Sequence, residues 1–128
     1  MRVLLDTHAL LWWLAGDERL PASARTVIAD PANEIFVSAA SAWEVSTKHR
    51  LGKLPGAGPL AVDFAAEVYR QGFAPLEISL EHAMVAGGLM SDHRDPFDRM
   101  LVAQARTEHM ALVSNETLFD QFDIVRIW

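Results

Sequence analysis

Short apolar segments alternate with longer amphipathic ones along most of this sequence. The short segments have the composition of buried β-strands, and the longer ones repeat apolar residues at helical spacing. Strands are expected at 3–5, 35–37, 74–78, 111–113 and 123–127, and helices at 7–15, 21–29, 39–51, 60–68, 80–84, 96–109 and 118–122. This alternation predicts an α/β fold with a mostly parallel central sheet of four to five strands, covered by helices on both faces in a three-layer α/β/α sandwich.

The chain has 128 residues, of which 51% are hydrophobic and 22% are charged. This length and composition are typical of one globular domain, so residues 1–128 are expected to form a single domain. The Pro- and Gly-rich stretch 55–59 interrupts the pattern, but neither flanking part has enough apolar content for a separate core. We interpret this stretch as a surface loop.

Several kinds of chemistry are excluded by residues that the sequence lacks. It has no cysteine, which excludes disulfides, thiolate zinc sites and cysteine nucleophiles and agrees with a reducing cytoplasm. Its five histidines do not have the HExxH spacing of zinc proteases. A GxSxG nucleophile elbow and a glycine-rich phosphate loop are also missing, which argues against a serine hydrolase and a nucleotide-binding protein.

The apolar start of the chain resembles a signal peptide only superficially, because Asp6 and His8 interrupt the apolar run. No other apolar run approaches the roughly 20 residues of a membrane-spanning helix, so we expect a cytoplasmic protein without a membrane partner.

The net charge of −6 argues against a protein that coats nucleic acid through a basic surface. It is compatible with a nuclease whose carboxylates hold cations that meet the substrate phosphate.

Acidic residues stand where the expected strands end and the helices begin. Asp6 follows the first strand, Glu44 lies on the helix after the second, and Asp95 and Asp98 lie at the start of a late helix. In open parallel sheets, ligands bind beyond the carboxyl ends of strands. Carboxylates gathered there suit Mg²⁺ or Mn²⁺, and a pair of such ions hydrolyses phosphodiesters with an activated water. We therefore predict a metal-dependent nuclease site.

Each of these acids also has a structural interpretation. Asp95 and Asp98 suit the N-cap and the first turn of a helix that begins with proline. Glu44 lies three residues after Ser41, which is the spacing of a capping box. Asp6 is harder to explain in this way, because a carboxylate directly after a buried strand must be solvated, paired or bound to metal.

Longer stretches of the sequence resemble the PIN domain and, within that family, the VapC-like ribonuclease toxins of bacterial toxin-antitoxin pairs. The matching stretches are LLDTHALLWWL (4–14), SAASAWEVSTKHRLGKL (38–54), HRDPFDRMLVAQA (93–105), LVSNETLF (112–119) and IVRIW (124–128). Together they extend over essentially the whole chain. The resemblance implies a PIN-like three-layer α/β/α fold.

The resemblance also implies roles for the acidic residues. Asp6, Glu44, Asp95 and Asp98 are expected to hold Mg²⁺ or Mn²⁺ and to catalyse the hydrolysis of RNA. Glu116 is an additional candidate ligand. Many relatives carry an aspartate at this turn, and the extra methylene of a glutamate moves its carboxylate outward.

Other residues are candidates for supporting roles. The hydroxyls of Thr7 and Ser114 lie near strand ends, where they can donate a hydrogen bond to a metal-bound carboxylate or a phosphate, or cap the following helix. If the substrate is RNA, phosphate contacts that position it can come from Arg94 and Arg99, or from Lys48, Arg50 and Lys53. We interpret Trp12, Trp13 and Trp43 as core or interface residues.

The resemblance further implies a cognate antitoxin that covers the active site, and a homodimer. Two other functions remain open. One is a catalytically inactive PIN-like module that binds RNA or protein, although intact acids argue against it. The other is a receiver-type signalling domain, which carries a lysine at a late strand end, whereas the only lysines here are Lys48 and Lys53.

Overall fold

A computed structural model describes residues 1–128. Its centre is a five-stranded sheet of β1 (Arg2–Leu5), β2 (Glu34–Ser38), β3 (Ala74–Leu76), β4 (Ala111–Val113) and β5 (Arg126–Ile127). The strands lie in the order β3-β2-β1-β4-β5, and every neighbouring pair is parallel. The predicted sheet is confirmed.

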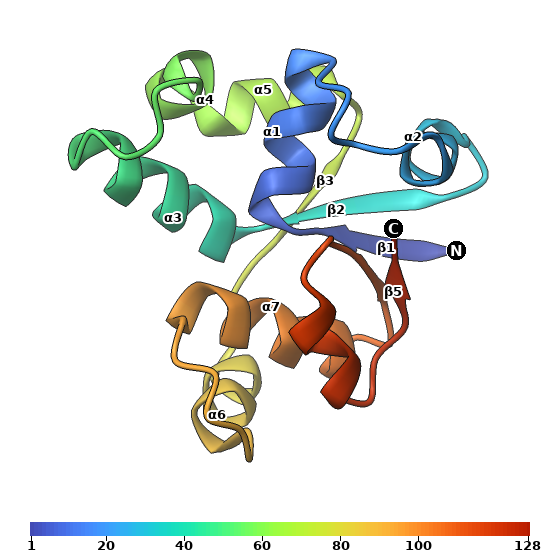
Figure 1. The fold of residues 1–128 in the computed structure, drawn as a ribbon, viewed down its shortest axis with the longest axis vertical. Helices are drawn as coiled ribbons and strands as arrows, with labels where there is room; N and C mark the ends of the chain where they lie inside the picture. Colours follow the sequence, from blue (N-terminus) through green and yellow to red (C-terminus); the bar gives the residue numbers. More distant parts are fainter.

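Helices cover both faces of the sheet (Figure 1). One face carries α1 (Thr7–Ala15), α2 (Ala22–Ala29), α3 (Ala39–Arg50), α4 (Gly58–Val62) and α5 (Phe64–Arg70). The other carries α6 (Leu80–Gly88), α7 (Pro96–Thr107) and the 3₁₀ helix η1 (Thr117–Gln121). The predicted three-layer arrangement is therefore confirmed. None of these helices has the length and apolar character needed to cross a lipid bilayer.

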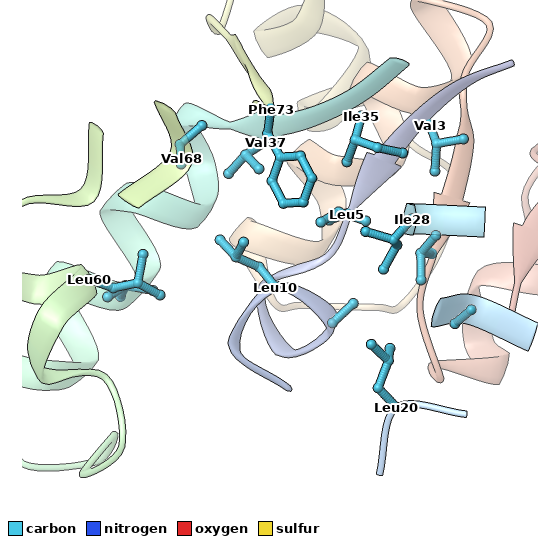
Figure 2. Packing of buried hydrophobic residues seen from close by; sticks show 14 of the residues in the cluster. Val3, Leu5, Leu10, Leu20, Ile28, Ile35, Val37, Leu60, Val68 and Phe73 are labelled. Carbon is cyan, nitrogen blue, oxygen red and sulfur yellow. The ribbon is translucent and has the colours of Figure 1, made fainter. Parts of the chain in front are cut away.

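The apolar run of β1 supplies side chains to two separate cores. Val3 and Leu5 pack in a cluster of 15 buried residues beneath α1 to α5, part of which Figure 2 shows. Leu4 points the other way and packs with Leu101 of α7 and Phe119 of η1 in a cluster of eight. Because successive strand residues face opposite sides, a fully covered strand has to be apolar at every position.

Several predicted boundaries are wrong. The loop expected at 55–59 is shorter, because α4 begins at Gly58. The helix expected at 60–68 is divided into α4 and α5 at Asp63, which leaves the helical conformation and whose carboxylate accepts a hydrogen bond from the Ala66 N–H at the start of α5. The last strand, expected at 123–127, comprises only Arg126–Ile127.

The strand order reverses at β1. From β1 the chain adds β2 and β3 on one side and then crosses to β4 and β5 on the other. Such a reversal opens a crevice beyond the carboxyl ends of the strands. The Asp6 N–H donates to the Val113 carbonyl at 3.0 Å, so the first residue after β1 lies next to the end of β4. Receiver domains have the order 2-1-3-4-5, and this sheet therefore excludes the receiver interpretation.

Candidate active site

A pocket of about 320 Å³ opens at this edge of the sheet. We call it the acid pocket, and its lining residues are Asp6, Thr7, His8, Trp12, Glu44, Lys48, Asp95, Asp98, Asn115 and Glu116. It contains all five acids that the sequence singled out, which come from segments as far apart as α1 and η1. The fold thus brings together every predicted metal-ligand candidate.

Asp6 is both a helix cap and a buried acid. Its carboxylate caps α1 by accepting a hydrogen bond from the Ala9 N–H at 2.7 Å. Burial raises the pKa of Asp6, because the ionised form loses its hydration, whereas the Ser114 hydroxyl and the Ala9 N–H act in the opposite direction. A buried carboxylate whose ionised form is poorly solvated is suited to bind a cation.

Glu44 lies on α3, with a side chain that is only 5% exposed. It forms an ion pair with Lys48, one helical turn further along, which is the spacing at which helix side chains meet. The capping box suggested by the sequence is wrong. The N-cap of α3 is Ser38, whose hydroxyl accepts a hydrogen bond from the Ala40 N–H.

Asp95 and Asp98 lie at the start of α7. Asp95 is the N-cap and accepts hydrogen bonds from the Phe97 and Asp98 N–H groups at 2.9 and 3.2 Å, so the cap interpretation is confirmed for a residue that also lines the acid pocket. An oxygen of Asp98 lies 2.9 Å from Nε2 of His93. Burial raises the pKa of Asp98 to about 6, and Asp95 and Glu44 contribute to the rise while His93 opposes it.

Glu116 follows β4 and caps η1, because its carboxylate accepts a hydrogen bond from the Leu118 N–H at 3.0 Å. The Glu116 N–H in turn donates to the Ser114 hydroxyl at 3.0 Å. The side chain still lines the acid pocket. It remains a candidate ligand.

The two predicted hydroxyls lie at the base of the site. The Thr7 hydroxyl donates to the Ser41 hydroxyl at 2.9 Å and so joins the start of α1 to α3. Ser114 is fully buried beside Asp6 and lowers the pKa of that carboxyl. Both contacts help to fix the position of the acids that flank them.

The predicted arginines lie outside the acid pocket. The guanidinium of Arg99 donates to backbone carbonyls at the end of α6 and in the loop before α7, namely those of Ala86, Gly87, Leu89, Ser91 and His93. These contacts favour a role in holding the loop rather than in contacting phosphate. Arg94 is exposed and makes no side-chain hydrogen bond or ion pair. Of the predicted phosphate-contacting residues, only Lys48 lines the pocket.

Three residues of the acid pocket were missed as site residues, namely His8, Trp12 and Asn115. Trp12 is the only hydrophobic residue of the lining, and its ring lies edge-on to that of His8 with 5.6 Å between centroids. His8 follows Asp6 by two residues, and Asn115 lies between Ser114 and Glu116. Proximity to predicted ligands was the available signal for both.

The residues fit a divalent cation by their chemistry, because the pocket offers carboxylate oxygens and contains no thiol. In the orientations of this structure, however, no three Asp, Glu or His side chains form a ready-made metal site. Asp6, Glu44, Asp95 and Asp98 are each engaged by a donor of the protein itself. A cation has to compete with these donors.

The raised pKa of Asp98 predicts a dependence of stability on pH in the absence of metal. Between about pH 4 and pH 6, folded Asp98 keeps a proton that the unfolded chain has lost, so this contribution to stability is complete at low pH and is lost as the pH rises through 6. We expect the wild type to lose roughly 1–3 kcal/mol relative to Asp98→Asn over this interval. Urea unfolding of both proteins in EDTA measures the difference, and parallel pH profiles would contradict the prediction.

Comparisons with known proteins agree with this geometry. The fold is similar to that of VapBC2 from Rickettsia felis bound to a promoter DNA fragment, with a TM-score of 0.70 at 15% identity over 98% of this chain and 97% of that one. It is also similar to VapC20 of Mycobacterium tuberculosis, a sarcin-ricin loop cleaving toxin, with a TM-score of 0.65 at 15% identity over 96% of both chains.

Sequence comparison gives a more specific likeness. The chain is 44% identical over 62 residues to Ribonuclease VapC16 of Mycobacterium tuberculosis. This match spans 48% of the chain and 43% of that relative, so less than half of either protein is compared. The family model of the PIN domain matches residues 3–125, which include all the acids of the pocket. The chain therefore belongs to the PIN domain family.

Proposed function

We propose that this protein is a divalent-metal-dependent endoribonuclease and the toxin of a toxin-antitoxin pair. Two relatives support the proposal: VapC16 is named a ribonuclease, and VapC20 is a toxin that cleaves the sarcin-ricin loop. Membership of the PIN domain family supports it as well.

The observation that carries the proposal is the acid pocket. Asp6, Glu44, Asp95 and Asp98 line one cavity at the point where the strand order reverses, although they lie on three different helices or their caps. Holding this many carboxylates together is unfavourable unless positive charge compensates them. Two of the four, Asp6 and Asp98, have a raised pKa, which burial causes in the first place and neighbouring carboxylates increase further.

In this proposal Asp6, Glu44, Asp95 and Asp98 hold Mg²⁺ or Mn²⁺, and Glu116 adds a further oxygen ligand. A bound divalent cation would neutralise charge on the phosphodiester and make a water molecule more acidic. The protein supplies the positions: Ser114 orients Asp6, and His93 orients Asp98. The α1 and α7 N-termini, which Asp6 and Asp95 cap, direct partial positive charge toward the pocket.

We also propose the partners of this activity. The substrate is RNA, and a cognate antitoxin covers the acid pocket in the resting pair, in a homodimeric and cytoplasmic protein. The similarity to a VapBC complex supports the antitoxin, because that relative was solved with its own partner and promoter DNA. Arg94 remains free at the surface for an RNA phosphate.

Metal dependence is the direct test. The purified chain is incubated with structured and unstructured RNA in EDTA, and Mg²⁺ or Mn²⁺ is then added. We expect internal cleavage only after the metal is added, together with a higher melting temperature, because the cation binds the folded state. Cleavage in EDTA would contradict the metal mechanism. RNA binding with neither cleavage nor a metal-induced rise in melting temperature would favour the inactive binding module.

A further inference from the structure

Lys48 holds a position that no other lysine or arginine of the protein shares. It is the only Lys or Arg that lines the acid pocket, and its side chain is 30% exposed. Arg50 and Lys53, at the end of α3 and just beyond it, are exposed and lie outside the pocket lining. The site that has to accept a highly negative substrate therefore carries a single permanent positive charge.

The ammonium of Lys48 forms an ion pair with Glu44, a proposed metal ligand. Nζ of Lys48 pairs with Oε2 of Glu44, and Glu44 is almost completely buried. The two residues lie on consecutive turns of α3, so the backbone holds them together whatever the rest of the pocket does. A buried carboxylate without a partner is costly, and Lys48 removes that cost when the pocket contains no metal.

The other acids of the pocket reinforce this arrangement. Asp95 and Asp98 line the same pocket as Lys48, and their charges favour its ammonium form in addition to Glu44. A divalent cation that binds among these acids meets the ammonium as a like charge and competes with it for Glu44. Repulsion between the two positive charges thus weakens the interaction of each with Glu44.

We propose that Lys48 is the internal counter-ion of the acid pocket: it neutralises Glu44 while metal is absent, gives up Glu44 to the cation, and then contacts a phosphate of the RNA. The inference rests on the proposed function. It assigns Lys48 as a residue that contacts the substrate.

The proposal predicts opposite effects of one substitution. Lys48→Met keeps the aliphatic stem and removes the charge, so the metal-free protein should melt at a lower temperature because Glu44 is left unpaired. The same variant should bind Mn²⁺ about tenfold more tightly, because the competing charge is gone. With RNA its KM should rise about tenfold while kcat changes less, because a phosphate contact is lost.

Lys53→Met is the matched control, because it removes the same charge from an exposed position outside the pocket. We expect it to change Mn²⁺ affinity less than twofold. If Lys48→Met does not fold, Lys48→Gln keeps a hydrogen-bond donor for Glu44 without the charge and takes its place. Calorimetric titration with MnCl₂ and thermal melting in EDTA give two readouts that do not depend on activity.

The outcomes separate the two proposals. Mn²⁺ binding and RNA cleavage by the wild type, with the opposite shifts in the Lys48 variant, support the inference. Wild-type binding and cleavage with equal Mn²⁺ affinities for Lys48→Met and Lys53→Met would overturn it and leave the proposed function intact. A wild type that neither binds Mn²⁺ nor cleaves RNA would overturn both.

Discussion

The Asp6→Asn variant is expected to lose RNA cleavage by at least about 100-fold, because a neutral amide is a poor ligand for a cation that contributes several kcal/mol to the reaction. The variant should nevertheless fold. Asparagine caps helices as well as aspartate does, so the hydrogen bond from the Ala9 N–H can be kept.

The Asp6→Asn substitution should not lower the stability of the metal-free protein, although it lowers activity. Burial raises the pKa of Asp6, which means that ionised Asp6 destabilises the metal-free protein at neutral pH. Asn avoids this cost, so the metal-free variant should melt at or above the wild-type temperature. Cleavage rates and thermal melts in EDTA test both statements. Asp123→Asn, an exposed acid outside the acid pocket, is the control. Wild-type cleavage by Asp6→Asn would show that the acid pocket is not the active site.

The Arg99→Met variant is expected to unfold about 3 kcal/mol more easily than the wild type, because several charge-assisted hydrogen bonds to backbone carbonyls are lost together. The guanidinium spans the end of α6 and the loop that leads to α7, and its contacts range from 2.8 to 3.4 Å. Without it, carbonyls such as those of Ser91 and His93 lose their donor.

Arg99→Lys should recover only part of this stability, because an ammonium lacks the planar fork that reaches several carbonyls at once. Arg94→Met is the control, since Arg94 is an exposed side chain five residues away that makes no side-chain hydrogen bond or ion pair. Urea unfolding of the metal-free proteins compares all four forms. Equal stabilities of the Arg99→Met and Arg94→Met variants would contradict the role of Arg99 as a clamp of the loop.

The sequence predicted the fold because the signals involved are local. The run Val3 to Leu5 is apolar at every position, and only a strand covered on both faces requires this. The start of α7 follows from Asp95 and Pro96, whose cap and first-turn preferences act over a few residues, whereas the role of Asp6 as the N-cap of α1 was not predicted. The division of the helix at Asp63 was missed, because an internal cap resembles an ordinary polar residue of a helix surface.

The acids of the candidate site were predictable from the sequence, but the groups that form hydrogen bonds and ion pairs with them were not. Asp6, Glu44, Asp95 and Asp98 stand at strand ends or on the helices near them, and the parallel sheet brings these positions to one edge. The sequence left open whether Asp95 is a cap or a site residue, and in the structure it caps α7 and also lines the acid pocket.

The alternation of apolar segments and the position of the acids thus determined the parallel sheet and the edge at which its carboxylates meet, because periodicity and capping act within a few residues. The partners of the charged side chains depended on contacts between segments distant in sequence. Arg99, expected at a phosphate, binds the loop after α6, and Lys48, one of several basic candidates, is the one that lines the acid pocket. Long side chains take the acceptors that packing brings within reach, and only the packed structure specifies which acceptors those are.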